Sequence, residues 1–564
     1  MVGVLDGFGL AMFLPLLQVA DGAGQVEAGG LGNLRFLVDG LERMGITLTL
    51  QSVLLVILFF FSLKGIARFI EVYYKVTVRQ LFIKKLRFDN VNKLSNYNYK
   101  SFVLADSGRI QNTLSGEVGR VAMAYQSYMA TVQSVVMVLV YVALAILSNP
   151  EFALLVAIGG LLSNAAFRQV YKRTKTASKK ISHDGHIFQG LLIQLVAYFK
   201  YLKATGLIGN FSKKLKEYIR KIEESNRKMG YYGGILSAAR EPLVVLVVVG
   251  VIMVQVTYFS QNMGLIILSL MFFYRSLNFL MNLQTNWNGF LNASGALESM
   301  TSFMRELNAG QEKYGSQKIE SFTSSIELYK VSFSYGEKAV LHNINLRINK
   351  NETVAFVGES GSGKTTLVNL LAGLMPVTNG EMHIDGRSSS EIFIPSWQQR
   401  IGYITQEPVI FNDSVFNNVT FWAESTVANK ARFWEALEKA AIGGFVRELP
   451  KQENAQLGTG GVMVSGGQKQ RLSIARELYK EVDVLIMDEA TSSLDSETEL
   501  AIQENIDTLK GHYTILIIAH RLATVKNADR IVLMSEGSIT DEGDFGSLLN
   551  QSGSFSKMVA LQEL

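Results

Sequence analysis

Residues 353–365 read TVAFVGESGSGKT, and this stretch decides the fold of the C-terminal part of the chain. Its second part, Gly358–Thr365, fits the pattern G-x-x-x-x-G-K-[ST] between a strand-like run and the helix-like run 366–374. Glycines in such a loop let backbone N–H groups close around phosphate oxygens at a helix N-terminus. Lys364 adds positive charge for the β- and γ-phosphates, and Thr365 offers a hydroxyl group to Mg²⁺. The stretch therefore predicts a nucleotide-binding P-loop.

A second element lies downstream, where residues 484–489 read VLIMDE. This is an apolar strand that ends in two carboxylates. Asp488 is expected to hold Mg²⁺ through its water shell, and Glu489 to polarise the attacking water as a general base. A strand that merely ends in two solvated acids is the alternative, and the P-loop upstream weighs against it.

The chain before about residue 310 has a different character, because long apolar runs alternate there with basic loops. A helix needs ~20 mostly apolar residues to cross ~30 Å of hydrocarbon, and most of the runs reach or approach that length. A large soluble core is the alternative, but residues 243–256 are hydrophobic on every side. We therefore predict an all-α transmembrane domain of six helices. The runs are Val2–Ala20, Ser52–Ile70, Val121–Leu147, Phe152–Phe167, Pro242–Phe259 and Leu265–Leu283.

Lys and Arg residues set the predicted orientation of these spans. They are concentrated in 75–109 and 168–228, whereas the turns 148–151 and 260–264 contain none. Cytoplasmic loops carry an excess of Lys and Arg, so the two basic connections are expected in the cytoplasm. Both connections are long and helix-like, which suggests that the spanning helices continue beyond the membrane.

The first run begins at Met1 and carries Asp6. A cleaved signal peptide would have a positive n-region and a small-residue cleavage site, and both are missing. We expect instead that the sequence begins inside the first helix. After this run, residues 31–44 have apolar residues at helical spacing opposite charged ones. This pattern is typical of a helix in the membrane interface, and equally of a short loop helix packed on its neighbours.

Composition excludes several classes of protein. The 564 residues include no cysteine, which excludes disulfide scaffolds, Cys-ligated zinc, iron–sulfur clusters and thiol nucleophiles. The net charge of +5 is too small for its length to argue for nucleic-acid binding, and we expect no nucleic-acid partner. No long stretch combines low hydropathy with high charge, which excludes disorder.

The chain resembles ATP-binding cassette (ABC) exporters, because Val464–Gln468 reads VSGGQ and matches the signature LSGGQ except at its first position. The resemblance covers nearly the whole chain. It implies that Tyr335 stacks on adenine and that Gln406 touches Mg²⁺ and reports to the membrane domain. It also implies that Ser492–Asp495 crosses a dimer interface and that His520 is the switch histidine on the γ-phosphate. A structural histidine would be the better reading of His520 without this context.

The resemblance implies a transmembrane domain over 1–310 and an α/β nucleotide-binding domain with an α-helical signature subdomain over 311–564. ATP and Mg²⁺ are the implied cofactors, with Glu489, His520 and Lys364 catalytic and Thr365, Gln406 and Asp488 near the metal. The implied nucleotide contacts are Tyr335, Gly358, Ser360, Gly361, Gly363, Lys364, Thr365, Thr366, Gln406, Ser465, Gly466, Gly467 and Gln468.

One chain holds one cassette, and in this family the signature of one cassette completes the site of the other. The resemblance therefore implies a dimer, either of two copies of this chain or of this chain and a related one. There is one departure from the family pattern. Thr459 stands where exporters usually carry an acid that contacts the membrane domain, which puts the detail of coupling in doubt.

Polar residues inside the spans are the candidates for binding cargo, because burying them in lipid is costly. Arg275 lies in the sixth run, and Lys64 and Arg68 lie in the second. These cations suggest a phosphate or another anionic head group. Pairing of Arg275 across helices, and of Arg68 with Glu71 at i, i+3, are the structural alternatives.

The opening residues 5–17, the segment 31–44 and Tyr274–Arg275 are similar to the PglK-type flippases of lipid-linked oligosaccharides in bacterial protein glycosylation. This similarity implies a multi-pass protein of the bacterial inner membrane with its cassette in the cytoplasm, moving an anionic polyprenyl-linked glycan. Two other hypotheses stay open. One is an exporter of lipids, peptides or drugs on the same frame, and the other is a soluble ABC ATPase of the chromosome or repair type, against which the apolar runs weigh.

Overall fold

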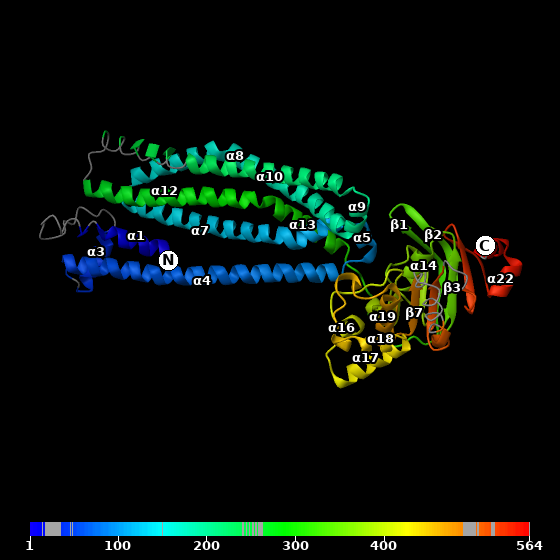
Figure 1. Cartoon of the computed structure of the whole chain (residues 1–564). Helices are drawn as coiled ribbons and strands as arrows, with labels where there is room; N and C mark the ends of the chain where they lie inside the picture. The colour runs from blue at the N-terminus through cyan, green and yellow to red at the C-terminus, as the bar shows by residue number, and fades with distance from the viewer. Residues whose placement is uncertain are drawn as a thin grey trace. The chain divides into compact units, whose positions relative to one another are not determined.

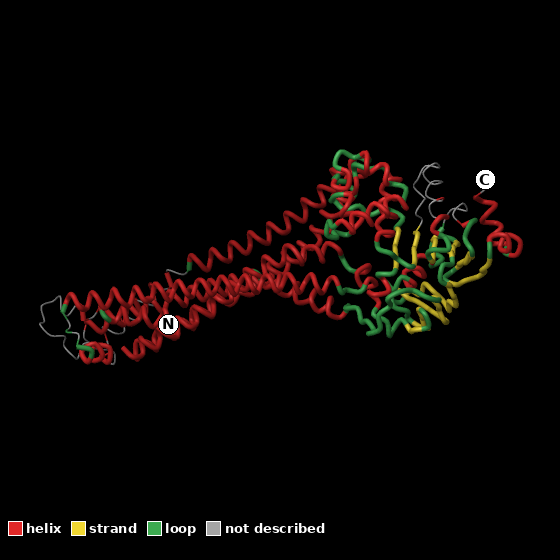
Figure 2. The backbone as a smooth tube through the Cα atoms, turned by 90° about the horizontal axis from the view of Figure 1, so that it is seen from below, coloured by secondary structure: helices red, strands yellow, loops and turns green. Residues whose placement is uncertain are grey.

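The computed structural model describes the chain except residues 14, 17–34, 46, 48, 149, 240–241, 244, 247–248, 251–252, 254–256, 258–262, 489–503, 505–506, 520–524 and 563–564. The chain forms two compact units. The first comprises Met1–Tyr97 and Leu104–Gln311, and the second comprises Asn98–Val103 and Glu312–Leu564. As described, the first unit is helical and the strands lie in the second (Figures 1 and 2). The segment Asn98–Val103 thus groups with the second unit, although it lies within the predicted membrane domain.

Long helices make up the first unit, and a π-helical turn, η2, interrupts one of them. Their bounds are α1 Val2–Ala11, α3 Arg35–Arg43, α4 Leu50–Ser95, α5 Tyr99–Leu104, α6 Ser107–Asn112, η2 Thr113–Glu117, α7 Val118–Ser148, α8 Pro150–Ala197, α9 Phe199–Ala204, α10 Ile208–Ala238, α12 Met263–Asn292 and α13 Ser294–Ala309.

The apolar runs of the sequence lie in these helices. The second, third, fourth and sixth runs fall in α4, α7, α8 and α12. The first run begins as α1, and the fifth, 242–259, lies largely outside the described residues. Among the described residues, the helical stretches Leu50–Ser95 and Ser107–Leu147 are long and apolar enough to cross a membrane. The helices α4 and α8 continue well past their apolar runs, as expected from the long basic connections.

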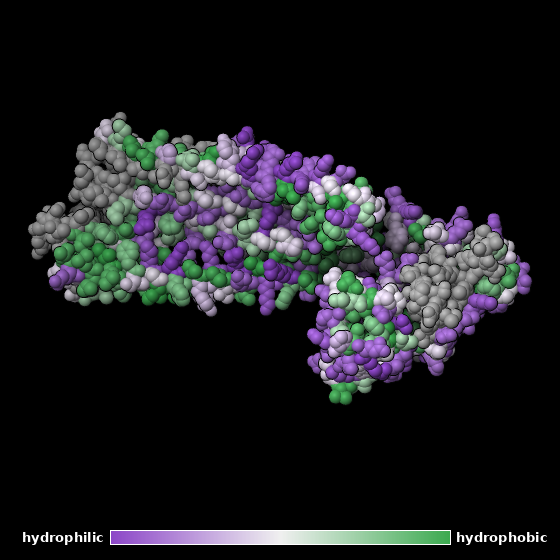
Figure 3. Space-filling view, in the orientation of Figure 1, coloured by the Kyte–Doolittle hydropathy of each residue, from purple (hydrophilic) through white to green (hydrophobic). Residues whose placement is uncertain are grey.

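The first half of α4 presents apolar side chains to the surface. Leu55, Leu58 and Phe59 are all more than 60% exposed. Figure 3 shows hydrophobic surface gathered over α1 and the start of α4, whereas hydrophilic residues cover much of α10. An apolar helix surface of this kind is suited to contact with lipid chains, which are as apolar as leucine.

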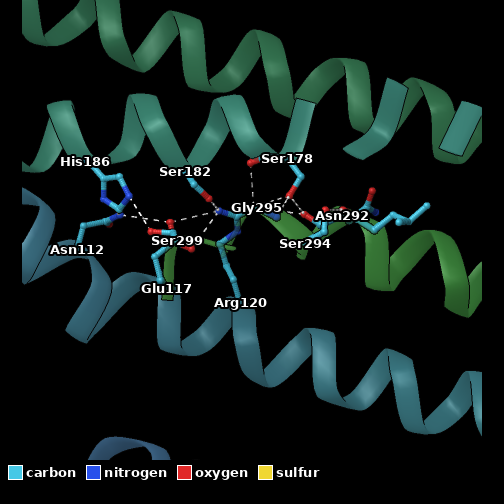
Figure 4. A network of polar contacts seen from close by, with 11 residues as sticks. Asn112, Glu117, Arg120, Ser178, Ser182, His186, Asn292, Ser294, Gly295 and Ser299 are labelled. Atoms are coloured by element: carbon cyan, nitrogen blue, oxygen red, sulfur yellow. Dashed lines mark hydrogen bonds and ion pairs between the residues drawn. The ribbon is translucent and has the colours of Figure 1, made fainter. Parts of the chain in front are cut away.

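A buried polar network joins α7, α8 and the break between α12 and α13 (Figure 4). Arg120 pairs with Glu117 at 3.2 Å and donates to the Ser178 hydroxyl at 3.1 Å. Ser178 donates to the carbonyl oxygen of Asn292 at 2.6 Å and accepts from the Gly295 N–H at 3.0 Å. Ser178 and Arg120 therefore satisfy backbone groups that the helix break would leave without partners.

The second unit has two sheets with helices packed on them. One sheet has the strand order β2-β1-β4-β5, and the other has the order β10-β9-β3-β8-β7-β6. In the second sheet, the strands from β9 to β6 are parallel and β10 is antiparallel at the edge. The strands are β1 Ser325–Tyr335, β2 Lys338–Asn349, β3 Thr353–Gly358, β4 Asn379–Ile384, β5 Arg387–Ser388, β6 Ile401–Ile404, β7 Val484–Asp488, β8 Thr514–Ile518, β9 Arg530–Ser535 and β10 Ser538–Gly543. The helices are α14 Lys364–Leu371, α15 Ile394–Gln398, α16 Val415–Thr420, α17 Val427–Lys439, α18 Gly443–Glu448, α19 Gly466–Tyr479, α22 Phe545–Gln551 and α23 Gly553–Gln562.

The central strand β3 is buried on both faces, as its apolar sequence predicts. Val354 and Phe356 belong to one hydrophobic cluster, and Ala355 and Val357 belong to the cluster on the opposite face. Helix α19 packs within the second of these clusters with α16 and α17. The predicted fold class, a helical N-terminal domain followed by an α/β P-loop domain with a helical subdomain, is confirmed, and burial of β3 fixes the loop that follows it.

Candidate nucleotide-binding site

The loop between β3 and α14 forms a tight cradle. Gly358 has φ +151°, and a Cβ atom there would lie 2.1 Å from the carbonyl oxygen of Met534. Gly363 caps α14 with φ +99°, a left-handed conformation that L side chains rarely adopt. The Lys364 Nζ donates to the carbonyl oxygens of Gly358 and Glu359 at 2.7 and 2.9 Å. The loop therefore curls around the lysine head group at the N-terminus of a helix, where anions are stabilised.

A cavity of about 600 Å³ opens beside this loop. Tyr335, at the end of β1, lines it together with the predicted phosphate-binding residues Ser360, Gly361, Gly363, Lys364, Thr365 and Thr366. Burial raises the pKa of Tyr335, so its ring is neutral and its hydroxyl group contacts the Met375 sulfur at 3.3 Å. The structure thus places an aromatic ring and the P-loop around one space. This is the arrangement that a purine ring with a phosphate chain requires.

The remaining predicted residues follow the parallel strands of the same sheet. Asp488 ends β7 and pairs in register with Ile518 of β8, and Ile518 also ends the strand before His520. Gln406 comes two residues after β6, the neighbour of β7. The carboxyl ends of parallel strands meet at one edge of a sheet, which is where ligands bind in α/β folds. Glu489 and His520 themselves lie outside the described residues.

The donor set at this edge suits Mg²⁺. Thr365 offers a hydroxyl oxygen beside the cavity, and Asp488 offers a carboxylate. Magnesium prefers hard oxygen ligands, usually one or two protein groups together with phosphate oxygens and water. Partial burial raises the pKa of the Tyr403 hydroxyl, and the Asp488 carboxylate raises it further. Tyr403 therefore stays protonated and donates to Asn369 at 3.2 Å.

The signature residues lie at another helix N-terminus. Ser465 caps α19: its hydroxyl accepts from the Gln468 N–H at 3.3 Å, and the Gln468 side chain accepts from the Ser465 N–H at 2.9 Å. This reciprocal pair is a capping box. It leaves the first N–H groups of α19, which include those of Gly466 and Gly467, directed outward from the helix. Thr459 lies upstream in a short turn, Thr459–Gly461.

The predicted cargo residues lie in the first unit, and the structure places all three in ion pairs. The Lys64 Nζ lies 2.5 Å from Oδ1 of Asp6, and the Arg275 Nε lies 3.8 Å from Oδ2 of the same carboxylate. Arg68 pairs with Glu71 at 3.2 Å on one face of α4. Cross-helix pairing of Arg275, which the sequence left open, is therefore what the structure has.

An apolar cavity of about 790 Å³ lies near these residues, between α1, α4 and α7. Its few polar side chains include Glu71, Lys75 and Gln133. Lys75 donates to the Gln133 side chain at 3.2 Å, so this polar side chain within the third apolar run is also paired.

Six lining residues of the nucleotide cavity were not predicted from the sequence, and three of them have titratable side chains. Lys338 and His342 of β2 and Glu536 from the β9–β10 turn line it with the P-loop. A faint signal exists for Lys338, which follows Tyr335 after one tight turn and pairs with it across β1 and β2. Glu536 comes from the turn after β9, 171 residues beyond Thr365 of the P-loop (536 − 365), and no local pattern marks it.

Comparison with known proteins agrees with this geometry. Residues 341–492 match the ABC transporter family model. A lipid A-core flippase of Syntrophus aciditrophicus (strain SB) is 42% identical over 245 residues, which cover 43% of this chain and 40% of that protein. A putative multidrug export ATP-binding/permease protein of Staphylococcus aureus is 40% identical over 252 residues, 44% of this chain and 43% of that protein. The chain thus spans less than half the length of these relatives.

Longer matches cover both units. The heterocyst differentiation ATP-binding protein HepA of Nostoc sp. is 29% identical over 468 residues, 82% of this chain and 76% of that protein. A solved bacterial Atm1-family ABC exporter with ATP bound superimposes with a TM-score of 0.82 at 21% identity, over 100% of this chain and 98% of that one. Residues 341–492 therefore carry an ABC transporter domain. More particularly, the whole chain has the fold of the Atm1-family ABC exporter, with a helical domain ahead of the nucleotide-binding domain.

Proposed function

We propose that this protein is an ATP-driven exporter or flippase of the bacterial inner membrane, acting as a dimer with its cassettes in the cytoplasm. One observation carries the proposal: Tyr335 and the P-loop line the same cavity. The chain that contains this cavity also contains long apolar helices. The position of Ser465–Gln468, at the N-terminus of a different helix from the P-loop helix α14, supports dimerisation. Their N–H groups are suited to cover the γ-phosphate bound by a partner cassette.

Each residue of the site has a role in phosphoryl transfer to water. The P-loop amides and Lys364 hold the β- and γ-phosphates, while Thr365, Gln406 and Asp488 hold Mg²⁺ or its waters. Mg²⁺ when bound neutralises the charge that develops on the phosphates. Glu489 accepts the proton of the attacking water, and His520 donates to the γ-phosphate. Charge must be neutralised on every side of that phosphate, so one chain alone leaves the site incomplete.

For the cargo we propose an amphipathic anionic lipid, specifically a polyprenyl-diphosphate-linked glycan or a similar molecule. Two cations, Lys64 and Arg275, share one carboxylate, so the cluster keeps a surplus positive charge inside the helical unit. A surplus charge in a membrane domain is costly unless an anion or water joins it. The relative named as a lipid A-core flippase suits an anionic lipid, whereas the one named as a putative multidrug exporter supports drugs or peptides as the second candidate.

Transport in reconstituted vesicles separates these candidates. We expect the wild-type protein to translocate a polyprenyl-diphosphate glycan only with hydrolysable ATP, and Lys364→Ala to abolish this. Arg275→Ala is expected to impair transport more than basal ATP hydrolysis, because it removes a cation from the cluster and leaves the cassette intact. Absence of glycolipid transport, together with hydrolysis stimulated by peptides or drugs, would support the second candidate instead.

A further inference from the structure

Asp6 of α1 is a buried carboxylate that contacts three other helices. Its side chain is only 3% exposed. Oδ1 accepts from Lys64 of α4 at 2.5 Å, and Oδ2 accepts from the Tyr141 hydroxyl of α7 and faces Arg275 of α12 at 3.8 Å. A buried carboxylate is tolerated only when such partners satisfy it. One side chain therefore sets the positions of groups on α4, α7 and α12.

Close helix packing holds Asp6 in this place. Gly7, the next residue, lets α1 approach α7 so closely that a Cβ atom there would lie 2.2 Å from Cδ1 of Leu144. Tyr141 is fully buried and stacks on Phe279 of α12 with 5.5 Å between ring centroids. Neither the carboxylate nor the tyrosine can move far, so the cations must adjust to them.

The two cations differ from the carboxylate in exposure. The side chain of Arg275 is 42% exposed and that of Lys64 is 27% exposed. Arg275 turns its Nε toward Asp6, which leaves its two terminal nitrogens for other acceptors. A guanidinium group bound on one edge and open at its end can take two phosphate oxygens at once. Two positive charges against one negative charge leave the cluster attractive to an anion.

We propose that Asp6 is a positioning residue, which holds the Arg275 guanidinium and the Lys64 ammonium so that their surplus charge binds the diphosphate group of a lipid cargo. This inference rests on the proposed function and assigns a role to a residue that the cargo does not reach. Without the carboxylate, Arg275 loses its anchor and the two cations repel each other, so affinity for the anion falls while the cassette is unaffected.

The test measures ATP hydrolysis by the full chain in liposomes as undecaprenyl diphosphate is added. Asp6→Asn is expected to raise the half-saturating lipid concentration about tenfold, the change that loss of one charge-assisted contact gives. The basal and maximal rates stay close to wild type. Arg275→Ala raises it similarly. Asp6→Asn adds less in the Arg275→Ala background than in wild type, and adds nothing when Lys64 is replaced by Ala as well. The matched control is Glu217→Gln, which breaks an exposed pair with Lys221 on α10 and should change nothing.

Several outcomes overturn the inference. Additive effects of Asp6→Asn and Arg275→Ala, or a wild-type half-saturation in Asp6→Asn, would show that Asp6 acts independently. Should Asp6→Asn not fold, Tyr141→Phe carries the test. It keeps the charge of Asp6 but removes the hydrogen bond that Tyr141 donates to Oδ2, so Arg275 is drawn inward and the half-saturating concentration rises. An unchanged half-saturating concentration in Tyr141→Phe refutes positioning. If the wild type itself ignores the lipid, the proposed cargo fails together with the inference, whereas a response lost only in Arg275→Ala leaves the cargo proposal standing.

Discussion

His186 shows how one residue couples the helical unit to pH. It lies in α8 and hydrogen-bonds with Asn112 at 3.0 Å and with Ser299 at 2.9 Å (Figure 4). Burial lowers its pKa from the ordinary 6.5, the charge of Arg109 lowers it further, and Asp106 opposes this in part. The charges of His183 and Arg120 also act to lower it. His186 is therefore neutral in the folded protein at neutral pH.

A lowered folded-state pKa makes stability depend on pH in one direction. Below pH 6.5 the histidine is protonated in the unfolded chain but still neutral in the folded chain. The free energy of unfolding is therefore highest above pH 6.5 and decreases as the pH falls toward the folded-state pKa. We expect the unfolding temperature to fall between about pH 7.5 and about pH 5.5. His186→Gln should reduce this fall, and His512→Gln, at an exposed position of the cassette, should not. Equal pH dependence in all three proteins would contradict the prediction.

At the scale of elements, the break between α12 and α13 depends on the absence of a side chain at Gly295. A Cβ atom there would lie 2.4 Å from the carbonyl oxygen of Ser178. Gly295→Ala must therefore push α13 from α8 and weaken the bonds that Ser178 makes to both helices. We expect it to destabilise the protein by about 1–3 kcal/mol, the usual cost of overpacking.

Gly230→Ala is the matched control for this change. A Cβ atom at Gly230 in α10 meets nothing within 4 Å, so alanine there should stabilise the helix by up to ~1 kcal/mol. Thermal unfolding of the purified full chain in detergent measures both variants. Equal unfolding temperatures for Gly295→Ala and Gly230→Ala would show that α13 is free to shift.

Elements whose signals are local could be predicted from the sequence, and contacts between distant elements could not. All residues of the P-loop lie within the stretch 358–365, and Gly363 adopts a left-handed backbone conformation that favours glycine. By contrast, Asp6, Lys64 and Arg275 stand on three helices, and no periodicity in any of them indicates which acid meets which cation. Polarity marked Arg275 as functional, but its partner became visible only once α1 and α12 were placed together.

At the scale of the molecule, the domain boundary shows the same limit. The change in composition near residue 310 predicts where the helical part ends. It does not show that Asn98–Val103, a few residues after the 46-residue helix α4, groups with the cassette. The Nζ of Lys100 in this segment lies 5.1 Å from the ring centroid of Phe333. A short charged segment within a basic loop gives no sequence signal for such a contact.

The proposed dimer makes a prediction about the whole molecule. Glu489→Gln should bind ATP normally but lower turnover by about 100-fold or more, because it removes the general base and keeps the shape of the side chain. With ATP and Mg²⁺ bound but not hydrolysed, the two cassettes should remain closed on each other, since each signature then covers the γ-phosphate of the other site.

The absence of cysteine makes this closure measurable. Met463, next to the signature, is 71% exposed, so Met463→Cys can carry a spin label at one position per chain. In Glu489→Gln, ATP should convert a broad distribution of distances between the two labels into one short distance. The same variant with Lys364→Ala should not respond, because it lacks the phosphate-binding lysine. Near-normal turnover in Glu489→Gln would remove the general-base assignment, and label distances that ignore ATP would remove the shared site, because a site completed by its partner cannot fill without bringing the partner closer.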